Sequence, residues 1–432
     1  MIATMRNAWR VDEIREKLLF TLFMILLYRL GNAITVPYID TAMLRDYFTQ
    51  VSNTVLGLMN TMSGSALERA SIFALSIQPY INASIIIQLL TIAIPALERL
   101  QKDGGEEGKK KLEKITRYST IAIAILQGYG YYVIIRNGIN GQTMLSSDAI
   151  GVWPPIIIVA TFVTGSALLM WMGEQITEFG IGNGISIILF VSIVSRFPTS
   201  LATAARSIMS DPSVWWIYVL MLIGALAIVV LIVIVTNAER RIPVQYSKRV
   251  VGRKMYGGQS THLPMKVNMS GVLPVIFAQS IASIPATITV FVPRWQDSWA
   301  MRVFDSKTLT YAALYFVLIV FFSYFYSTVQ FNPIEIANNL RKNGGFIPGF
   351  RAGKPTSEFI QNVLTKITLF GALYLAVIAI TPILISRFSY TAAASGISLG
   401  GTSVIIVVSV ALETIKQLES QLLLRHYKGF LE

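Results

Sequence analysis

The sequence predicts an all-α membrane protein with ten transmembrane helices in two inverted five-helix halves around a central pore. Its composition supports this class, because 53% of the residues are hydrophobic and only 14% are charged, whereas soluble chains are about 25% charged. Its charges are also separated by long apolar runs. The chain contains no cysteine and only two histidines, so we expect no disulfide, no metal site and no cofactor.

Ten segments are expected to span the membrane. A spanning helix needs about 20 apolar residues, and eight uncharged runs approach or exceed this length: 70–97, 118–135, 149–173, 212–238, 267–293, 308–334, 367–386 and 388–412. Two weaker segments complete the set, 18–37, which Arg29 interrupts, and 179–195, which ends before Arg196. We recognise no cleavable signal peptide, so the first span is expected to be retained.

The distribution of basic residues predicts the topology. If the N-terminus is cytoplasmic, most of the 36 Lys and Arg residues fall in cytoplasmic segments, as the positive-inside rule requires. Both termini are then cytoplasmic. The chain divides into halves at residues 1–213 and 214–432, which enter the membrane from opposite sides. Such halves can pack around a pseudo-two-fold axis with a functional site between them. No sequence repeat supports this division, so it depends on topology alone.

The segment 70–97 is the most informative. It carries Gln78, Asn82 and Gln88 and contains Pro79, which a helix that only faces lipid would avoid. We therefore expect a kinked helix that faces a partner helix or a water-filled cavity. The preceding segment 57–69 is predicted to be a short helix, too short and polar to span. A short polar helix followed by a kinked span is typical of a pore.

Four motifs resemble segments of the SecY family. They are QPYINASIIIQLL at 78–90, GEQITEFGIGNG at 173–184, YGGQSTHLPMKVNMSG at 256–271 and FIPGFRAG at 346–353. The resemblance covers nearly the whole chain, although Pro37-Tyr38 stands where many relatives have Pro-Gly. Members of this family are central subunits of the bacterial protein-conducting translocon. The resemblance implies a channel in the plasma (inner) membrane that passes unfolded secretory polypeptides and releases signal or transmembrane segments sideways into lipid.

The resemblance implies an apolar collar in the pore. A thin collar between two water-filled funnels would desolvate a passing charge over only a short distance. The matching aliphatic residues are Ile77, Ile81, Ile185, Leu189, Ile276 and Ile406. The pairs 77/81 and 185/189 are spaced i,i+4, so each pair shares a helix face. Leu189 replaces the more usual isoleucine. The alternative, that these side chains face lipid or fill the core, is the one that spacing alone favours.

The resemblance also implies a plug at 57–69, a short helix that seals the collar from the outer side. Its candidate residues are Gly57, Asn60, Ser63, Gly64, Ser65, Glu68 and Arg69. The alternative is an ordinary amphipathic loop outside the membrane.

A lateral gate is implied between the second and third helices on one side and the seventh and eighth on the other. Asn82, Gln88 and Asn268 could hydrogen-bond across the closed gate. Such bonds within the membrane contribute only about 0.6–2 kcal/mol each, which suits a gate. Equally, these amides could bond within their own helices.

Two long loops, 237–267 and 331–366, are predicted to form a cytoplasmic docking surface, the first as a basic hairpin. Their candidate residues are Arg240, Arg241, Lys248, Arg249, Arg253, Lys254, Arg341, Lys342 and Arg351. Cations clustered in this way could contact RNA phosphates or an acidic protein surface. The resemblance implies the ribosome and the SecA motor ATPase as partners here, with Arg351 important for SecA. It also implies the small membrane subunits SecE and SecG.

Two other classes of membrane protein fit the sequence less well. A secondary transporter usually carries charges at midplane, which the eight best spans lack. An intramembrane enzyme would need a catalytic motif such as HExxH, and none occurs. There is no Walker A motif either, so we expect no enzymatic activity and an energy supply from partners. Arg29 is interpreted as snorkelling to the outer surface or pairing with Asp40.

Overall fold

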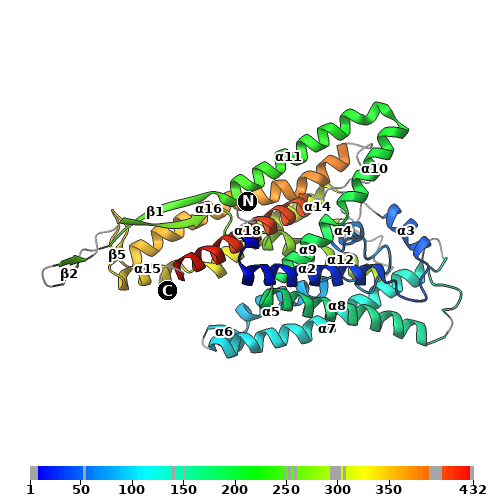
Figure 1. Ribbon diagram of the computed structural model, residues 1–432, viewed down its shortest axis with the longest axis horizontal. Coiled ribbons are helices and arrows are strands. Elements are labelled where there is room, and N and C mark those ends of the chain that lie inside the picture. The colour runs from blue at the N-terminus through cyan, green and yellow to red at the C-terminus, as the bar shows by residue number, and fades with distance from the viewer. Residues whose placement is uncertain are drawn as a thin grey trace.

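The computed structural model describes residues 8–428, with gaps at 52–54, 103, 139–141, 150, 247–248, 252–253, 257–259, 292–302, 305–307 and 389–400. The described residues form long helices packed side by side, and one end of the bundle carries β-strands that project beyond the helices (Figure 1). Many large apolar side chains face outward, above all on α11 (Trp215–Asn237). Such a surface suits lipid rather than water, so this is a multi-span membrane protein.

The regular elements in the described part of the first half are helices, joined by turns and loops. These helices are α2 (Asp12–Ala33), α3 (Thr41–Gln50), α4 (Val55–Met62), α5 (Gln78–Ala93), α6 (Pro95–Lys102), α7 (Gly105–Asn137), α8 (Trp153–Phe179), α9 (Gly184–Val194) and α10 (Phe197–Ser210). Helices α5, α7, α8 and α9 pack in chain order, each against the next.

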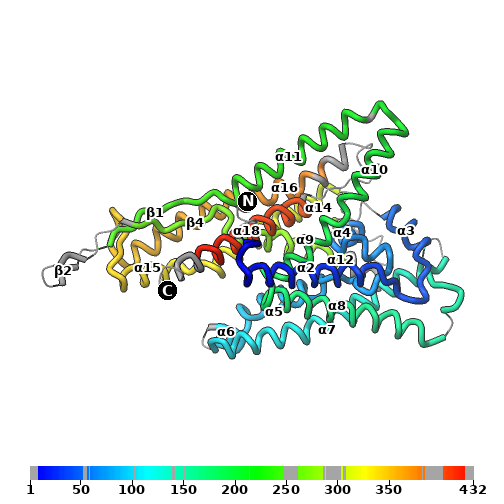
Figure 2. Tube along the Cα trace, viewed as in Figure 1, coloured from blue at the N-terminus to red at the C-terminus, as the bar shows by residue number. Residues whose placement is uncertain are grey.

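The second half adds strands to its helices. After the short 3₁₀ helix η1 (Pro212–Val214) come α11, β1 (Glu239–Tyr246), β2 (Arg249–Val251), β3 (Lys254–Tyr256), β4 (Ser260–Lys266), α12 (Leu273–Phe291), α14 (Leu309–Gln330), α15 (Pro333–Lys342), β5 (Gly345–Phe346), α16 (Lys354–Phe388) and α18 (Gly401–Lys428). Helix α14 packs on α12 and α16, and α18 packs on α11 and α16. The helices of the first half meet those of the second half where α9 contacts α18 and where α12 contacts α7 and α5 (Figure 2).

The ten-span count is not confirmed, although each predicted span overlaps a helix. Of the helices within the described residues, six are long and apolar enough to cross a membrane, or seven if the bent pair α5 and α6 forms one span. The three remaining predicted spans correspond to α2, α12 and α18. Helix α2 carries charged residues near its start and Arg29 further along, and α12 contains Pro285. In α18, the uncharged stretch ends at Glu413 after a few turns.

The span predicted at 70–97 is not one helix, which corrects that prediction. Residues 72–77 form turns, and α5 begins at Gln78 with Pro79 in its first turn. Proline favours this position, because its missing N–H would have no intrahelical partner there. The helix axis then bends by 106° between α5 and α6, where Pro95 begins the second helix. The two prolines therefore divide the segment into a turn, a helix and a bent continuation.

The helix predicted at 57–69 is also shorter than expected. It begins earlier, at Val55, and ends at Met62. Gly64 and Ser65 then adopt left-handed backbone angles, with φ of 68° at each, which no α-helix can continue through. The rest of this segment consists of turns that lead to α5.

The predicted basic hairpin is confirmed. Strands β1 and β4 pair antiparallel from Glu239↔Lys266 to Gln245↔Ser260, and β5 pairs with the far end of β1. A second ribbon, β2 with β3, lies at the tip. Ile242, Val244 and Met265 are buried against residues of α16 such as Ile360, so the sheet is anchored to a helix that continues into the bundle.

Candidate functional site

The six predicted collar residues lie together in the largest hydrophobic cluster of the described chain. They come from four helices: Ile77 and Ile81 at the start of α5, Ile185 and Leu189 on α9, Ile276 on α12 and Ile406 on α18. Five are less than 9% exposed, and Ile185 is half-buried against the same cluster. They therefore do not face lipid. Their role as a pore collar stays a prediction.

The short helix α4 reaches this cluster through Met62, which is 4% exposed and belongs to it. The amide of Gln279 on α12 contacts the Met62 sulfur, with Nε2 and Sδ 3.0 Å apart. Helix α4 itself packs against α9. The predicted plug segment, residues 57–69, therefore contacts the same apolar cluster in which helices of both halves meet.

Side chains within the plug segment hold its turn in shape. The Asn60 amide donates to Glu68 Oε2 at 2.7 Å and accepts from the Glu68 backbone N–H at 3.1 Å. The Ser63 hydroxyl donates to the Asn60 carbonyl at 2.9 Å. Gly57 is buried, and its carbonyl accepts from Thr61. Ser65 is buried too, whereas Arg69 is exposed.

Two polar contacts join α5 to the second half of the chain. The Tyr326 hydroxyl on α14 donates to Gln88 Oε1, and Gln78 donates to the Ser280 hydroxyl on α12 at 3.4 Å. Gln88 was a predicted gate residue. Gln78 and Tyr326 were not, although the amide at Gln78 was visible in the apolar segment. Nothing in the sequence indicated that Tyr326 would face α5.

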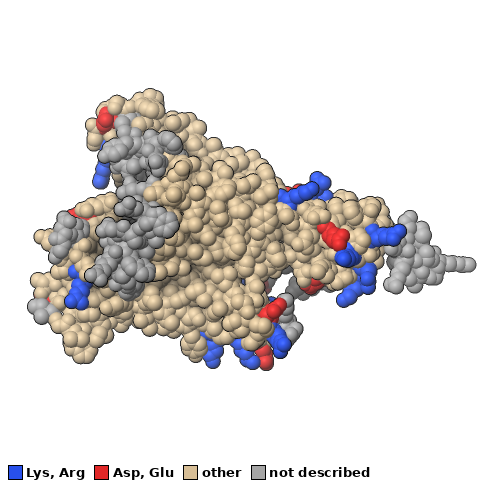
Figure 3. All heavy atoms as spheres, turned by 180° about the vertical axis from the view of Figure 1, so that it is seen from behind, with Lys and Arg blue, Asp and Glu red and all other residues tan. Residues whose placement is uncertain are grey.

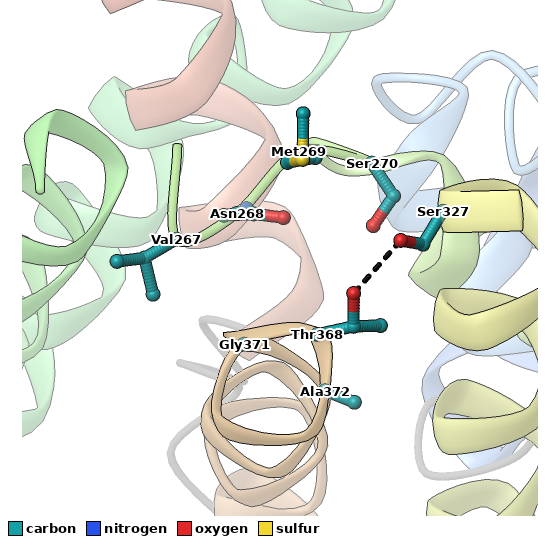
Figure 4. Close-up of a pocket in the computed structure, with 8 residues that line it drawn as sticks. All are labelled: Val267, Asn268, Met269, Ser270, Ser327, Thr368, Gly371 and Ala372. Carbon is teal, nitrogen blue, oxygen red and sulfur yellow. Dashed lines mark hydrogen bonds between the residues drawn. The ribbon is translucent and has the colours of Figure 1, made fainter. Parts of the chain in front are cut away.

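The other two predicted gate residues have different surroundings. Asn82 on α5 has a buried Oδ1 without a hydrogen-bond partner among the described residues. Asn268 lines a small pocket with residues of α14 and α16 (Figure 4). The Ser327 and Thr368 hydroxyls hydrogen-bond there, with the oxygens 2.8 Å apart. Asn268 therefore lies beside α14 and α16.

The basic docking candidates with described side chains are exposed at the strand-bearing end: Arg240, Arg241, Arg341, Lys342 and Arg351. Figure 3 shows Lys and Arg side chains gathered on this projection. Arg241 pairs with Glu239 at 2.6 Å on the surface. Arg249 and Lys254 lie on β2 and β3, and Lys248 and Arg253 lie outside the described residues.

Of the two interpretations of Arg29, snorkelling or pairing with Asp40, the pairing is not formed between these two described residues. The Asp40 carboxylate instead caps α3, accepting from the backbone N–H groups of Ala42 at 2.9 Å and Met43 at 3.2 Å. This is the usual use of an aspartate before a helix. Arg29 is half-buried on α2, beside the exposed apolar residues Leu26 and Leu30.

Comparison with known proteins decides the family. The SecY family model matches residues 71–415. The protein translocase subunit SecY of Streptomyces scabiei is 42% identical over 443 residues, covering 100% of both chains. The subunits of Streptomyces griseus and Mycobacterium tuberculosis are 45% and 41% identical, again with 100% coverage of both chains. The chain belongs to the SecY family.

Solved structures share the SecY fold with this chain at low sequence identity. A structure of a protein-conducting channel has a TM-score of 0.66 and 17% identity, covering 94% of this chain and 92% of its own. Sec61 in a canine ribosome–channel complex has a TM-score of 0.61 and 16% identity, covering the same shares, 94% and 92%. At such identities the likeness concerns the fold alone.

Proposed function

We propose that this chain is the channel subunit of a protein translocase, passing unfolded secretory polypeptides across the bacterial plasma membrane. One observation carries the proposal: six aliphatic side chains from four helices, drawn from both halves of the chain, meet in one cluster that also receives Met62 of the plug segment. Membership of the SecY family supports this reading.

The apolar cluster would act as a collar. Leucine and isoleucine seal a narrow opening when packed, and they yield by changing rotamers because they make no directional bonds. A polypeptide that passes through a thin collar exposes each charged side chain to the apolar zone only briefly, which limits the desolvation cost. A longer apolar tunnel would stop charged residues, and a polar tunnel would leak ions.

The plug segment would close this collar from the outer side. The segment is largely buried: Met62 lies in the collar cluster, Leu67 lies in a second apolar cluster, and the Tyr131 hydroxyl of α7 donates to the Leu67 carbonyl. Opening the collar would require the segment to break these contacts as well as the Arg196–Thr61 hydrogen bond.

The contacts Gln88–Tyr326 and Gln78–Ser280 would close a lateral gate between α5 and the pair α12 and α14. Intramembrane hydrogen bonds contribute about 0.6–2 kcal/mol each. Two of them resist opening without preventing it, and a hydrophobic signal segment that packs between these helices could compensate for their loss. Asn82 and Asn268 remain further candidates for this gate.

Energy and targeting would come from partners. The exposed cations of β1, α15 and the loop around Arg351 form a surface suited to RNA phosphates or to an acidic protein face. We infer that the ribosome and the SecA ATPase dock there and that SecE and SecG accompany the chain. Both termini are inferred to be cytoplasmic, and the halves 1–213 and 214–432 are inferred to have inverted topology.

Reconstitution tests the proposal. Proteoliposomes containing this chain with SecE and SecG, supplied with SecA, ATP and an unfolded preprotein, should protect the preprotein from added protease. Replacing Arg351 with Glu should lower this protection at least tenfold without changing the yield of assembled complex. Protection that is equal in empty liposomes, or solute uptake without preprotein transport, would contradict the proposal.

A further inference from the structure

The end of α9 holds the plug segment through a set of polar contacts that the collar and gate do not explain. Arg196, which directly precedes α10, donates from Nη1 to the Thr61 hydroxyl of the plug segment at 2.7 Å. Thr61 directly follows Asn60, whose side chain closes the turn by bonding to Glu68. The arginine therefore contacts the plug segment at the base of this turn.

A second contact lies one helical turn earlier on α9. The Ser192 hydroxyl donates to the Ile188 carbonyl at 2.7 Å. The Tyr28 hydroxyl of α2 lies 2.6 Å from Ser192 Oγ and 3.5 Å from the carbonyl of Ser63 in the plug segment. Because the Ser192 proton is directed at Ile188, the single Tyr28 hydroxyl proton is donated to Ser192 Oγ, and the Ser63 carbonyl is a longer contact at 3.5 Å. Tyr28 is 1% exposed, so it is fixed in place.

The third contact is a close backbone approach. Gly64 has a φ of +68°, and a Cβ added there would lie 2.7 Å from the Ser192 carbonyl oxygen. Only glycine allows the plug turn to lie so near α9. Thr61, Ser63 and Gly64 therefore all contact one short surface, formed by Tyr28, Ser192 and Arg196.

The guanidinium of Arg196 is not needed to satisfy the backbone hydrogen bonds at the junction of α9 and α10. The backbone N–H of Arg196 bonds to Ile193 and its carbonyl accepts from Ser200, so the junction is satisfied without the guanidinium. A half-buried cation that donates to a neutral hydroxyl forms a strong hydrogen bond, and loss of either partner leaves the other group poorly paired.

We propose that Arg196 is a positioning residue that latches the plug segment onto α9 in its closed position, with Thr61 as its acceptor and with Tyr28 and Ser192 completing the seat. The proposal depends on the proposed function in one respect, that residues 57–69 seal the pore. Opening then requires the Arg196–Thr61 bond to break, so this pair sets how often the resting channel leaks ions.

The test measures ion conductance of the assembled translocase in planar bilayers without preprotein. Arg196→Ala should open about ten times more often than the parent channel, the effect of one lost charge-assisted hydrogen bond. Thr61→Val removes the acceptor at nearly constant volume and should give the same increase. The double variant should leak no more than either single variant, and Arg196→Lys should restore part of the seal.

Matched controls separate the possible failures. Arg206→Ala removes an exposed arginine of α10 and should leave conductance unchanged, and thermal unfolding of each complex checks its folding. A channel lacking residues 57–69 should leak in the same assay. If that deletion leaks while Arg196→Ala and Thr61→Val stay tight, the latch is refuted and the channel function stands. If the deletion also stays tight, the plug's sealing role fails.

Discussion

At the scale of single residues, the proposed collar and the plug contacts join side chains that lie far apart in the chain. The i,i+4 spacing of 77/81 and 185/189 indicated shared helix faces, and the family resemblance selected these positions among many aliphatic residues. The structure places them in one cluster. Tyr326 and Arg196 could not be found in this way, because their importance comes from contacts with residues more than a hundred positions away.

Gly64 gives a residue-scale prediction. Gly64→Ala should raise the resting ion leak several-fold, because the added methyl group would lie 2.7 Å from the Ser192 carbonyl and the backbone φ is positive. The backbone strain alone costs about 1–2 kcal/mol. Gly151→Ala is the matched control, since it has a φ of +104° with open space around its Cβ. If Gly64→Ala and Gly151→Ala raised the resting ion leak equally, the increase would be due to backbone strain rather than to displacement of the plug segment.

The Gln88–Tyr326 contact gives a second prediction at this scale. Tyr326→Phe removes only the hydroxyl that donates to Gln88, and the ring should keep its packing on Phe277, 4.9 Å away between centroids. We expect weakened signal sequences to be exported several-fold better, because the closed gate loses one bond. Export of preproteins with defective signal sequences is measured for Tyr326→Phe, for Gln88→Leu and for the double variant. Additive gains in the double variant would show that the two side chains act separately.

At the scale of elements, the sequence located helices better than it located their ends. Pro79 was expected to kink a long helix, yet it begins one, because proline is favoured in a first turn. Likewise, the plug helix ends at Met62 because Gly64 and Ser65 take left-handed angles. Serine in that conformation has no clear sequence signal. The basic hairpin was predictable because its basic and apolar residues partly alternate, and the apolar Ile242 and Val244 pack with residues of α16.

The plug segment carries the element-scale prediction. A channel lacking residues 57–69 should show a large rise in resting ion conductance, because Met62 no longer covers the apolar cluster. Preprotein transport should continue, since the collar itself is intact. Single-channel conductance and protease protection are measured on the same preparation. Abolished transport with a normal amount of assembled complex would show that the segment belongs to the conducting path instead.

At the scale of the whole molecule, composition and hydropathy predicted the class, and charge distribution predicted an even number of spans. The structure finds six or seven clear spans in its described part, because α2, α12 and α18 carry charges or a proline that shorten their apolar stretches. Packing of α9 on α18 and of α12 on α7 brings the two halves together. Periodicity within a helix cannot predict such contacts, since they depend on the complete arrangement.

Crosslinking tests the central claim most directly. A secretory chain stalled in transit is exposed to a photoreactive residue placed at Ile81, Ile276 or Ile406, and in separate channels at Leu222, an exposed residue of α11. If the apolar cluster is the conducting collar, all three cluster positions should crosslink to the stalled chain and Leu222 should not. Crosslinks from Leu222 alone, or none from the cluster, would contradict a path through the centre of the molecule.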